Sequence, residues 1–153
     1  MKQYTEKDIK VVDWEKHVRE NPSMYFDESR ITPETLRKAI EYTALKLGAK
    51  YISITQIDNW CYFSAEHDWL LQSNYKFKSI SQIFTGPGPF PEAKQLNAFR
   101  TESLLLPFSS DAYTISKEEM SVLKGKAPDQ STIEKHLRNL GKWARVIGCK
   151  LNA

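Results

Sequence analysis

The chain has few of the residues that cross-link small proteins or bind metals. Its 153 residues include two cysteines, six glycines and three histidines. Cys61 and Cys149 lie far apart and form neither a Cys-x-x-Cys pair nor a Cys/His cluster, so the sequence encodes no disulfide framework and no zinc site. We therefore expect two buried free thiols, and neither a metal nor a cofactor.

Long hydrophobic runs are also missing. No apolar stretch approaches the roughly 20 residues that a membrane-spanning helix needs, and the start MKQYTEKDIK lacks the apolar stretch of a signal peptide. The expectation is a cytoplasmic protein without a membrane partner. With 41% hydrophobic residues, a chain of this length can bury one core, so we predict a single domain, 1–153, with an N-terminal arm, 1–12.

Net charge is small, at +3, which gives no general case for nucleic-acid binding. The charge is nevertheless uneven, because Glu134 is the only acid from residue 131 to the end. The basic residues of this stretch are Lys135, Arg138, Lys142, Arg145 and Lys150. Such a face is commonly just solvated, but it also suits the steering of an acidic partner.

Capping and turn residues predict the first elements. Asp13 is a suitable N-cap for a short helix that ends before Pro22. Thr32 followed by Pro33 predicts the start of a second helix, which Gly48 stops. Residues 51–57 and 60–65 are rich in β-branched and aromatic side chains, and the Asp58-Asn59 pair between them favours a tight turn, so we predict an antiparallel hairpin.

The second half of the chain has weaker signals. We predict strands over residues 75–83 and 102–106. Ser116 to Glu119 and Ser131 to Glu134 both fit the capping box, so a helix is expected after each, the last one reaching Gly148. The predicted fold class is α+β: a two-layer sandwich of a mixed, mostly antiparallel sheet with helices packed on one face.

The opening of the chain, YTEKDIKVVDWEKHVRENPSMYF, carries a tyrosine, an isoleucine five residues later, a short helix, then Val-Arg, a proline and Met-Tyr. In this order it resembles the ATPase domain of DNA gyrase and its topoisomerase relatives (GHKL ATPases). The long helix and the hairpin follow in the same order, so the resemblance covers residues 4 to about 70. It implies an ATP pocket on a mixed sheet.

The family's long helix carries Glu-x-x-x-Asn, whose glutamate is the general base and whose asparagine holds magnesium. One alignment places Glu41 at the base and Leu45 at the metal ligand, whereas the other places Leu36 and Ile40 there. An apolar side chain cannot coordinate Mg²⁺, which prefers oxygen. Both alignments therefore remove the metal ligand.

The family's Asp-x-Gly-x-Gly segment reads adenine. Here the sequence is SAEHDWL, in which Glu66 or Asp68 offers an acid while His67 and Trp69 occupy the glycine places. The glycine-rich lid is represented by Gly86-Pro-Gly88, and proline donates no amide hydrogen to a phosphate. We interpret the chain as a degenerate relative that has lost its nucleotide site.

The aromatic residues suggest binding instead. On the second hairpin strand, Trp60 and Tyr62 share one face and the smaller residues share the other, so we expect these two rings to point outward, with Trp69 nearby. Exposed tryptophan and tyrosine dominate binding hot spots, although core packing under a second layer is the competing interpretation.

We therefore expect a non-catalytic protein-binding module, most simply an immunity-type inhibitor that occludes the active site of a partner toxin. Its predicted contacts are Trp60, Tyr62, Trp69, Lys135, Arg138, Lys142 and Arg145. The alternatives are a divergent ATP-binding domain using Glu41 with Glu66 or Asp68, and a subunit mimic that pairs with a topoisomerase or with itself through the arm. Nucleic-acid binding through the last helix is a weaker idea.

Overall fold

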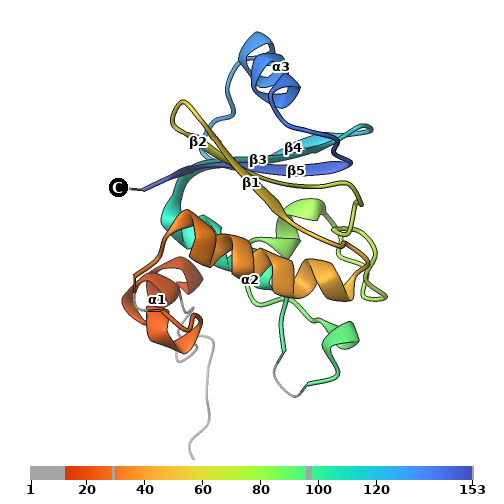
Figure 1. The fold of residues 1–153 in the computed structure, drawn as a ribbon. Helices are drawn as coiled ribbons and strands as arrows, with labels where there is room; N and C mark the ends of the chain where they lie inside the picture. Colours follow the sequence, from red (N-terminus) through yellow and green to blue (C-terminus); the bar gives the residue numbers. More distant parts are fainter. Residues whose placement is uncertain (1–12, 29, 96–97, 153) are drawn as a thin grey trace, which may run out of the picture.

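The computed structural model describes residues 13–28, 30–95 and 98–152, so the predicted arm lies outside the described residues. A five-stranded sheet of order β1-β2-β5-β3-β4 crosses the molecule (Figure 1). Its strands are β1 (Ser53–Ile57), β2 (Trp60–Ala65), β3 (Ser109–Ser116), β4 (Met120–Lys124) and β5 (Arg145–Leu151). The α+β class is confirmed. All of the strand pairings are antiparallel among the described residues, whereas the sequence predicts a mixed sheet.

The two predicted N-terminal helices are confirmed as α1 (Trp14–Glu20) and α2 (Pro33–Lys46). The Asp13 carboxylate accepts a hydrogen bond from the Lys16 amide, and the Thr32 hydroxyl accepts one from the Thr35 amide. Gly48 follows α2 with φ of 106°, a conformation that side chains other than glycine rarely adopt. Local capping chemistry thus fixes both ends of α2.

The predicted hairpin is also confirmed. Ile57 of β1 faces Trp60 of β2 across a two-residue turn, and Asp58 in that turn has φ of 55°. Aspartate adopts this left-handed conformation more readily than most residues other than glycine.

The predicted last helix is wrong in its second half. The helix α3 (Gln130–Arg138) ends early, and the chain returns as β5, which lies between β2 and β3 at the centre of the sheet. Residues 145–149 of β5 are all buried. A strand that is buried on both faces reads as a continuous apolar run, which periodicity alone does not separate from a helix.

Three further predictions are wrong. The Ser116 hydroxyl accepts from the Glu118 and Glu119 amides and so closes a β3–β4 turn, where the capping pattern predicts a helix. Residues 102–106 lie across the 3-10 turns Thr101–Leu104 and Leu106–Phe108, and residues 75–83 contain only the 3-10 turn Ile80–Ile83. Neither segment pairs with a described strand.

Helices cover both faces of the sheet, which corrects the prediction that they pack on one face. α1, α2 and the 3-10 turns lie on one side with the larger core, and α3 lies on the other (Figure 1). Under α3 a smaller cluster contains Tyr62, Tyr113 and Val146. In the described part of the chain, no helix is long and apolar enough to cross a membrane.

Candidate functional site

Glu41, the predicted general base, is held by a neighbouring arginine on α2. The Arg37 guanidinium lies 2.6 Å from a Glu41 carboxylate oxygen and contacts Glu34 at the same distance. Leu36 and Ile40 belong to the core. Glu41 is therefore part of a helix-surface ion network, and neither alignment of α2 exposes a metal ligand at a pocket.

The predicted adenine-reading acids point to different places. Asp68 makes two hydrogen bonds to the buried Arg145 guanidinium, at 2.9 and 2.8 Å. Glu66 is exposed and lines a separate hollow of about 750 Å³ with His67 and Lys142. The structure thus brings Glu66 and Lys142 to one hollow and assigns Asp68 to an internal ion pair.

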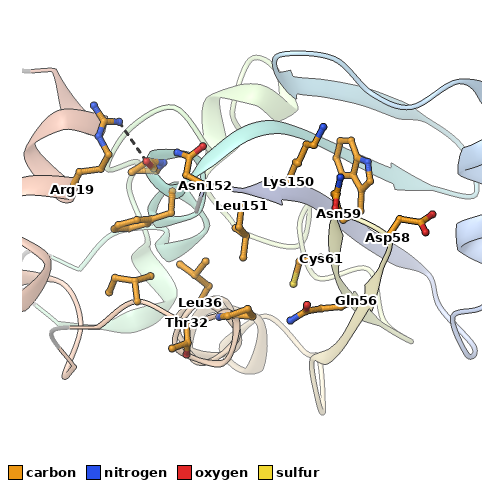
Figure 2. A pocket seen from close by; sticks show the side chains of 15 residues that line it. Arg19, Thr32, Leu36, Gln56, Asp58, Asn59, Cys61, Lys150, Leu151 and Asn152 are labelled. Carbon is orange, nitrogen blue, oxygen red and sulfur yellow. Dashed lines mark hydrogen bonds between the residues drawn. The ribbon is translucent and has the colours of Figure 1, made fainter.

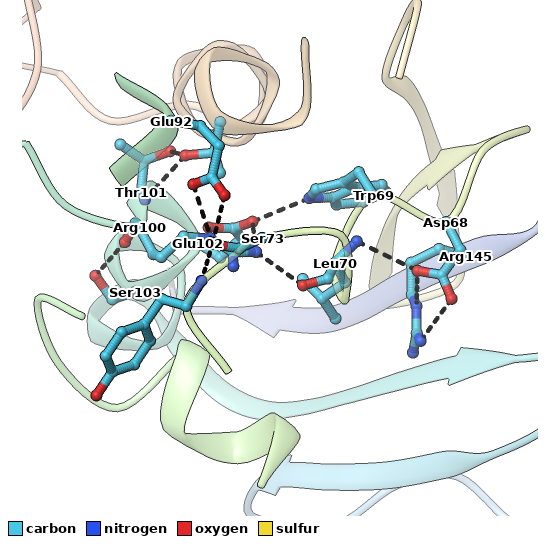
Figure 3. Close-up of polar contacts among 12 residues, drawn as sticks. Asp68, Trp69, Leu70, Ser73, Glu92, Arg100, Thr101, Glu102, Ser103 and Arg145 are labelled. Atoms are coloured by element: carbon cyan, nitrogen blue, oxygen red, sulfur yellow. Dashed lines mark hydrogen bonds and ion pairs between the residues drawn. The ribbon is translucent and has the colours of Figure 1, made fainter. Parts of the chain in front are cut away.

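Trp69 is fully buried, which corrects its assignment as a partner contact. Its indole N–H donates to the Glu102 carboxylate at 2.9 Å, and Glu102 is also paired with the buried Arg100 guanidinium at 2.8 Å (Figure 3). Arg100 also donates to the Leu70 carbonyl oxygen. This network ties the segment after β2 to residues 100–102, so its charges serve the fold.

Tyr62 is fully buried as well, so the prediction that it points outward is wrong. Its phenol accepts a hydrogen bond from the Tyr113 hydroxyl at 3.0 Å and lies 2.5 Å from Nδ1 of His136 on α3. Nε2 of His136 lies 2.9 Å from the Asp58 carboxylate at the hairpin turn. Burial raises the pKa of Tyr62. This chain of hydrogen bonds anchors α3 to the sheet.

Arg145 lies in the centre of the sheet and is fully buried, so it also leaves the predicted contact set. The remaining predicted cations, Lys135, Arg138 and Lys142, are exposed. Trp60 is partly buried and stacks on Tyr62, with ring centroids 6.5 Å apart.

A second tryptophan, which sequence reasoning missed, lies beside one of these cations, Arg138. Trp143 is partly buried, and the Lys117 ammonium lies 3.6 Å from its ring centroid. Trp143 lines a hollow of about 400 Å³ with Arg138 and Leu137. Its position directly after Gly141-Lys142 could have suggested an exposed turn. We call the following set the α3 surface: Trp60, Lys135, Arg138, Lys142 and Trp143.

A larger hollow, of about 780 Å³, lies between the start of α2, the hairpin and the end of β5 (Figure 2). Leu36, Cys61 and Leu151 contribute apolar atoms, while Gln56 and Thr32 contribute polar ones. Arg19 lies at one end, where it donates to the Pro107 carbonyl oxygen at 3.4 Å. The lining mixes apolar and polar groups, and it includes none of the three predicted carboxylates, Glu41, Glu66 and Asp68.

The two thiols lie away from solvent, inside the sheet. Cys61 and Cys149 are free and buried, as predicted. Burial raises the pKa of Cys61 to about 12 and that of Cys149 well above its ordinary value, so both stay protonated at neutral pH. In the ranges that the structure describes, no three His, Cys, Asp or Glu side chains are grouped to hold a metal ion.

No protein-family model matches the chain, and neither a curated protein nor a solved structure does so. The candidate site is therefore defined by geometry alone.

Proposed function

We propose that this chain is a non-catalytic protein-binding module of the immunity type, which neutralises a partner toxin in the cytoplasm by covering its active site. The observation that supports this proposal is the α3 surface. There, three exposed cations, Lys135, Arg138 and Lys142, accompany the partly exposed Trp60 and Trp143.

The chemistry of this surface suits an acidic protein partner. Tryptophan and arginine are enriched among the residues that carry binding energy, and exposed cations accelerate association with a negatively charged surface. The hydrogen-bond chain from Tyr113 to Asp58 holds α3 in one position. A preorganised surface loses less conformational entropy on binding.

We further propose that the resemblance to gyrase-type ATPases reflects a shared scaffold whose nucleotide site is lost. Glu41, Glu66 and Asp68 support this because their carboxylates lie in three different settings. Titration calorimetry with Mg-ATP distinguishes the two functions. Micromolar binding that Glu41→Ala abolishes would favour the divergent ATP-binding domain and contradict our proposal.

The direct test is to co-produce the chain with the product of the neighbouring reading frame and measure binding and rescue from toxicity. Reversing three charges, in Lys135→Glu/Arg138→Glu/Lys142→Glu, is expected to weaken binding by about tenfold or more, mainly through slower association. Trp143→Ala is expected to accelerate dissociation.

The matched control reverses three exposed lysines elsewhere, in Lys46→Glu/Lys78→Glu/Lys94→Glu, which changes the net charge equally. It should keep most of the affinity. Equal losses in the two triple variants would contradict a role for the α3 surface. A complex with a topoisomerase subunit in place of a toxin would support the subunit-mimic alternative.

A further inference from the structure

The strand β4 leaves one edge of the sheet open. β4 pairs with β3 on one side. On its other side, no backbone group of Met120–Lys124 is hydrogen-bonded to another described residue. An unpaired strand edge is a template for another strand, and proteins usually protect such edges with charges, prolines or coverage.

Two exposed side chains on this edge strand are apolar, whereas a protected edge would carry charged residues or proline. Met120 is 40% exposed and Val122 is 49% exposed. They lie opposite Ile115 and Tyr113 of β3, so both point to the face of the sheet that carries α3. The other edge strand, β1, has the polar Ser53 and Thr55 on that face, and its one apolar residue there, Ile57, is partly buried. β4 is therefore the edge with the apolar surface that marks an interface.

The two ends of β4 carry opposite charges, which would match each other if two copies of the strand ran antiparallel. Glu118 precedes the strand and Lys126 follows it, and both are exposed. Neither forms an ion pair within the described ranges, whereas Glu119 lies near Arg145 and Lys124 contacts Glu15. One end of the edge thus carries an uncommitted acid and the other an uncommitted base.

We propose that β4 pairs antiparallel with β4 of a second copy of this chain, which extends the two sheets into one. A two-fold axis at Val122 places the Val122 side chains of the two copies against each other, with Met120 of each copy beside them. Because the strands run in opposite directions, the same axis brings Glu118 of each copy toward Lys126 of the other. Such an isologous contact closes at two copies, so it yields a dimer and no filament.

Sedimentation velocity over a series of micromolar concentrations tests the dimer. The wild-type chain is expected to show a concentration-dependent dimer, and Val122→Lys is expected to weaken it by about tenfold or more, because the ammonium groups would meet across the axis. Circular dichroism confirms that the variant is folded. A wild-type monomer at every concentration, or a dimer that Val122→Lys leaves unchanged, would overturn the proposal.

Charge variants test the geometry without touching the apolar residues. Glu118→Lys alone and Lys126→Glu alone each place like charges together, so each is expected to dimerise more weakly than the wild type. A mixture of the two restores both opposite-charge contacts and is expected to form a heterodimer more tightly than either variant self-associates. Equal association in the mixture and in the separate variants would contradict the antiparallel arrangement.

Discussion

The Tyr62 hydroxyl takes part in two hydrogen bonds, so it sets the direction of the whole series of hydrogen bonds from Tyr113 to Asp58. Because it accepts from Tyr113, its own hydrogen is directed to Nδ1 of His136. Nε2 of His136 then carries the proton that is donated to Asp58.

We predict that Tyr62→Phe is more destabilising than Tyr113→Phe. Removing the Tyr62 hydroxyl leaves the buried His136 Nδ1 without a donor and the Tyr113 hydroxyl without an acceptor, which costs about 2–4 kcal/mol. Tyr113→Phe removes only the hydrogen bond that Tyr62 accepts, and Tyr62 can still donate to His136. The expected loss in the free energy of unfolding is therefore about 0.5–1.5 kcal/mol. Urea unfolding of both variants measures the difference. Equal losses of stability in the two variants would contradict the assigned donor direction, from Tyr113 to Tyr62 to His136.

Gly148 gives a second prediction at the scale of one residue. A Cβ atom there would lie 2.7 Å from a Tyr62 ring carbon and 2.9 Å from a Tyr113 ring carbon. Both rings are buried and cannot move aside, so Gly148→Ala is expected to cost about 1–3 kcal/mol in the free energy of unfolding. A Cβ atom at Gly141 would meet no atom within 4 Å, so Gly141→Ala is the control and should be near neutral. A similar loss in both would contradict a steric cause.

At the scale of elements, the sequence predicts those whose ends are fixed by local chemistry. α1, α2 and the hairpin begin or turn at Asp13, Thr32 and Asp58, whose side chains or backbone act within a few residues. β5 cannot be found in this way, because its strand character comes from partners that are distant in sequence. Ser116 shows the converse: its hydroxyl caps two amides, but those amides belong to a turn.

The N-cap of α3 predicts a dependence of stability on pH. Hydrogen bonds from Thr132, and then Ser131, lower the pKa of the Asp129 carboxyl below its ordinary value. A carboxyl whose pKa is lower in the folded state stabilises the protein above its unfolded pKa, and this contribution is lost as pH falls through the folded value. The stability of α3 should therefore decrease below about pH 4.

Asp129→Asn isolates this contribution, because asparagine also caps helices but does not titrate. The difference in unfolding free energy between wild type and variant, measured in urea, should shift against the wild type as pH falls from about 6 to about 3. The other carboxyl groups titrate equally in both proteins, so their contributions cancel when the two unfolding free energies are subtracted. A difference that stays constant over this range would contradict the role of the Asp129 charge.

At the scale of the whole molecule, the sequence predicts the candidate site in part. Lys135, Arg138 and Lys142 are exposed as expected, because long cationic side chains are rarely buried without a partner. The prediction misplaces Arg145 because it extends a helix over β5, and the acidic partner of Arg145, Asp68, is 77 residues away in sequence. Burial of a charge by a distant partner leaves no local signal.

The Asp68–Arg145 pair joins the segment after β2 to the central strand, so it gives a prediction about global stability. Arg145 is fully buried and Asp68 supplies both of its short hydrogen bonds, with Glu119 at 3.4 Å. Asp68→Ala leaves this buried guanidinium without its main counter-charge and is expected to cost about 3–5 kcal/mol.

The double variant Asp68→Ala/Arg145→Met separates loss of the pair from loss of one partner. Removing both charges avoids an unpaired buried cation, and methionine fills much of the arginine volume, so the double variant should be more stable than Asp68→Ala alone. Urea unfolding of the wild type and both variants measures this order. If the double variant were the less stable of the two, the Arg145 stem and its contact with Thr114 would hold the sheet more than the charge pair does.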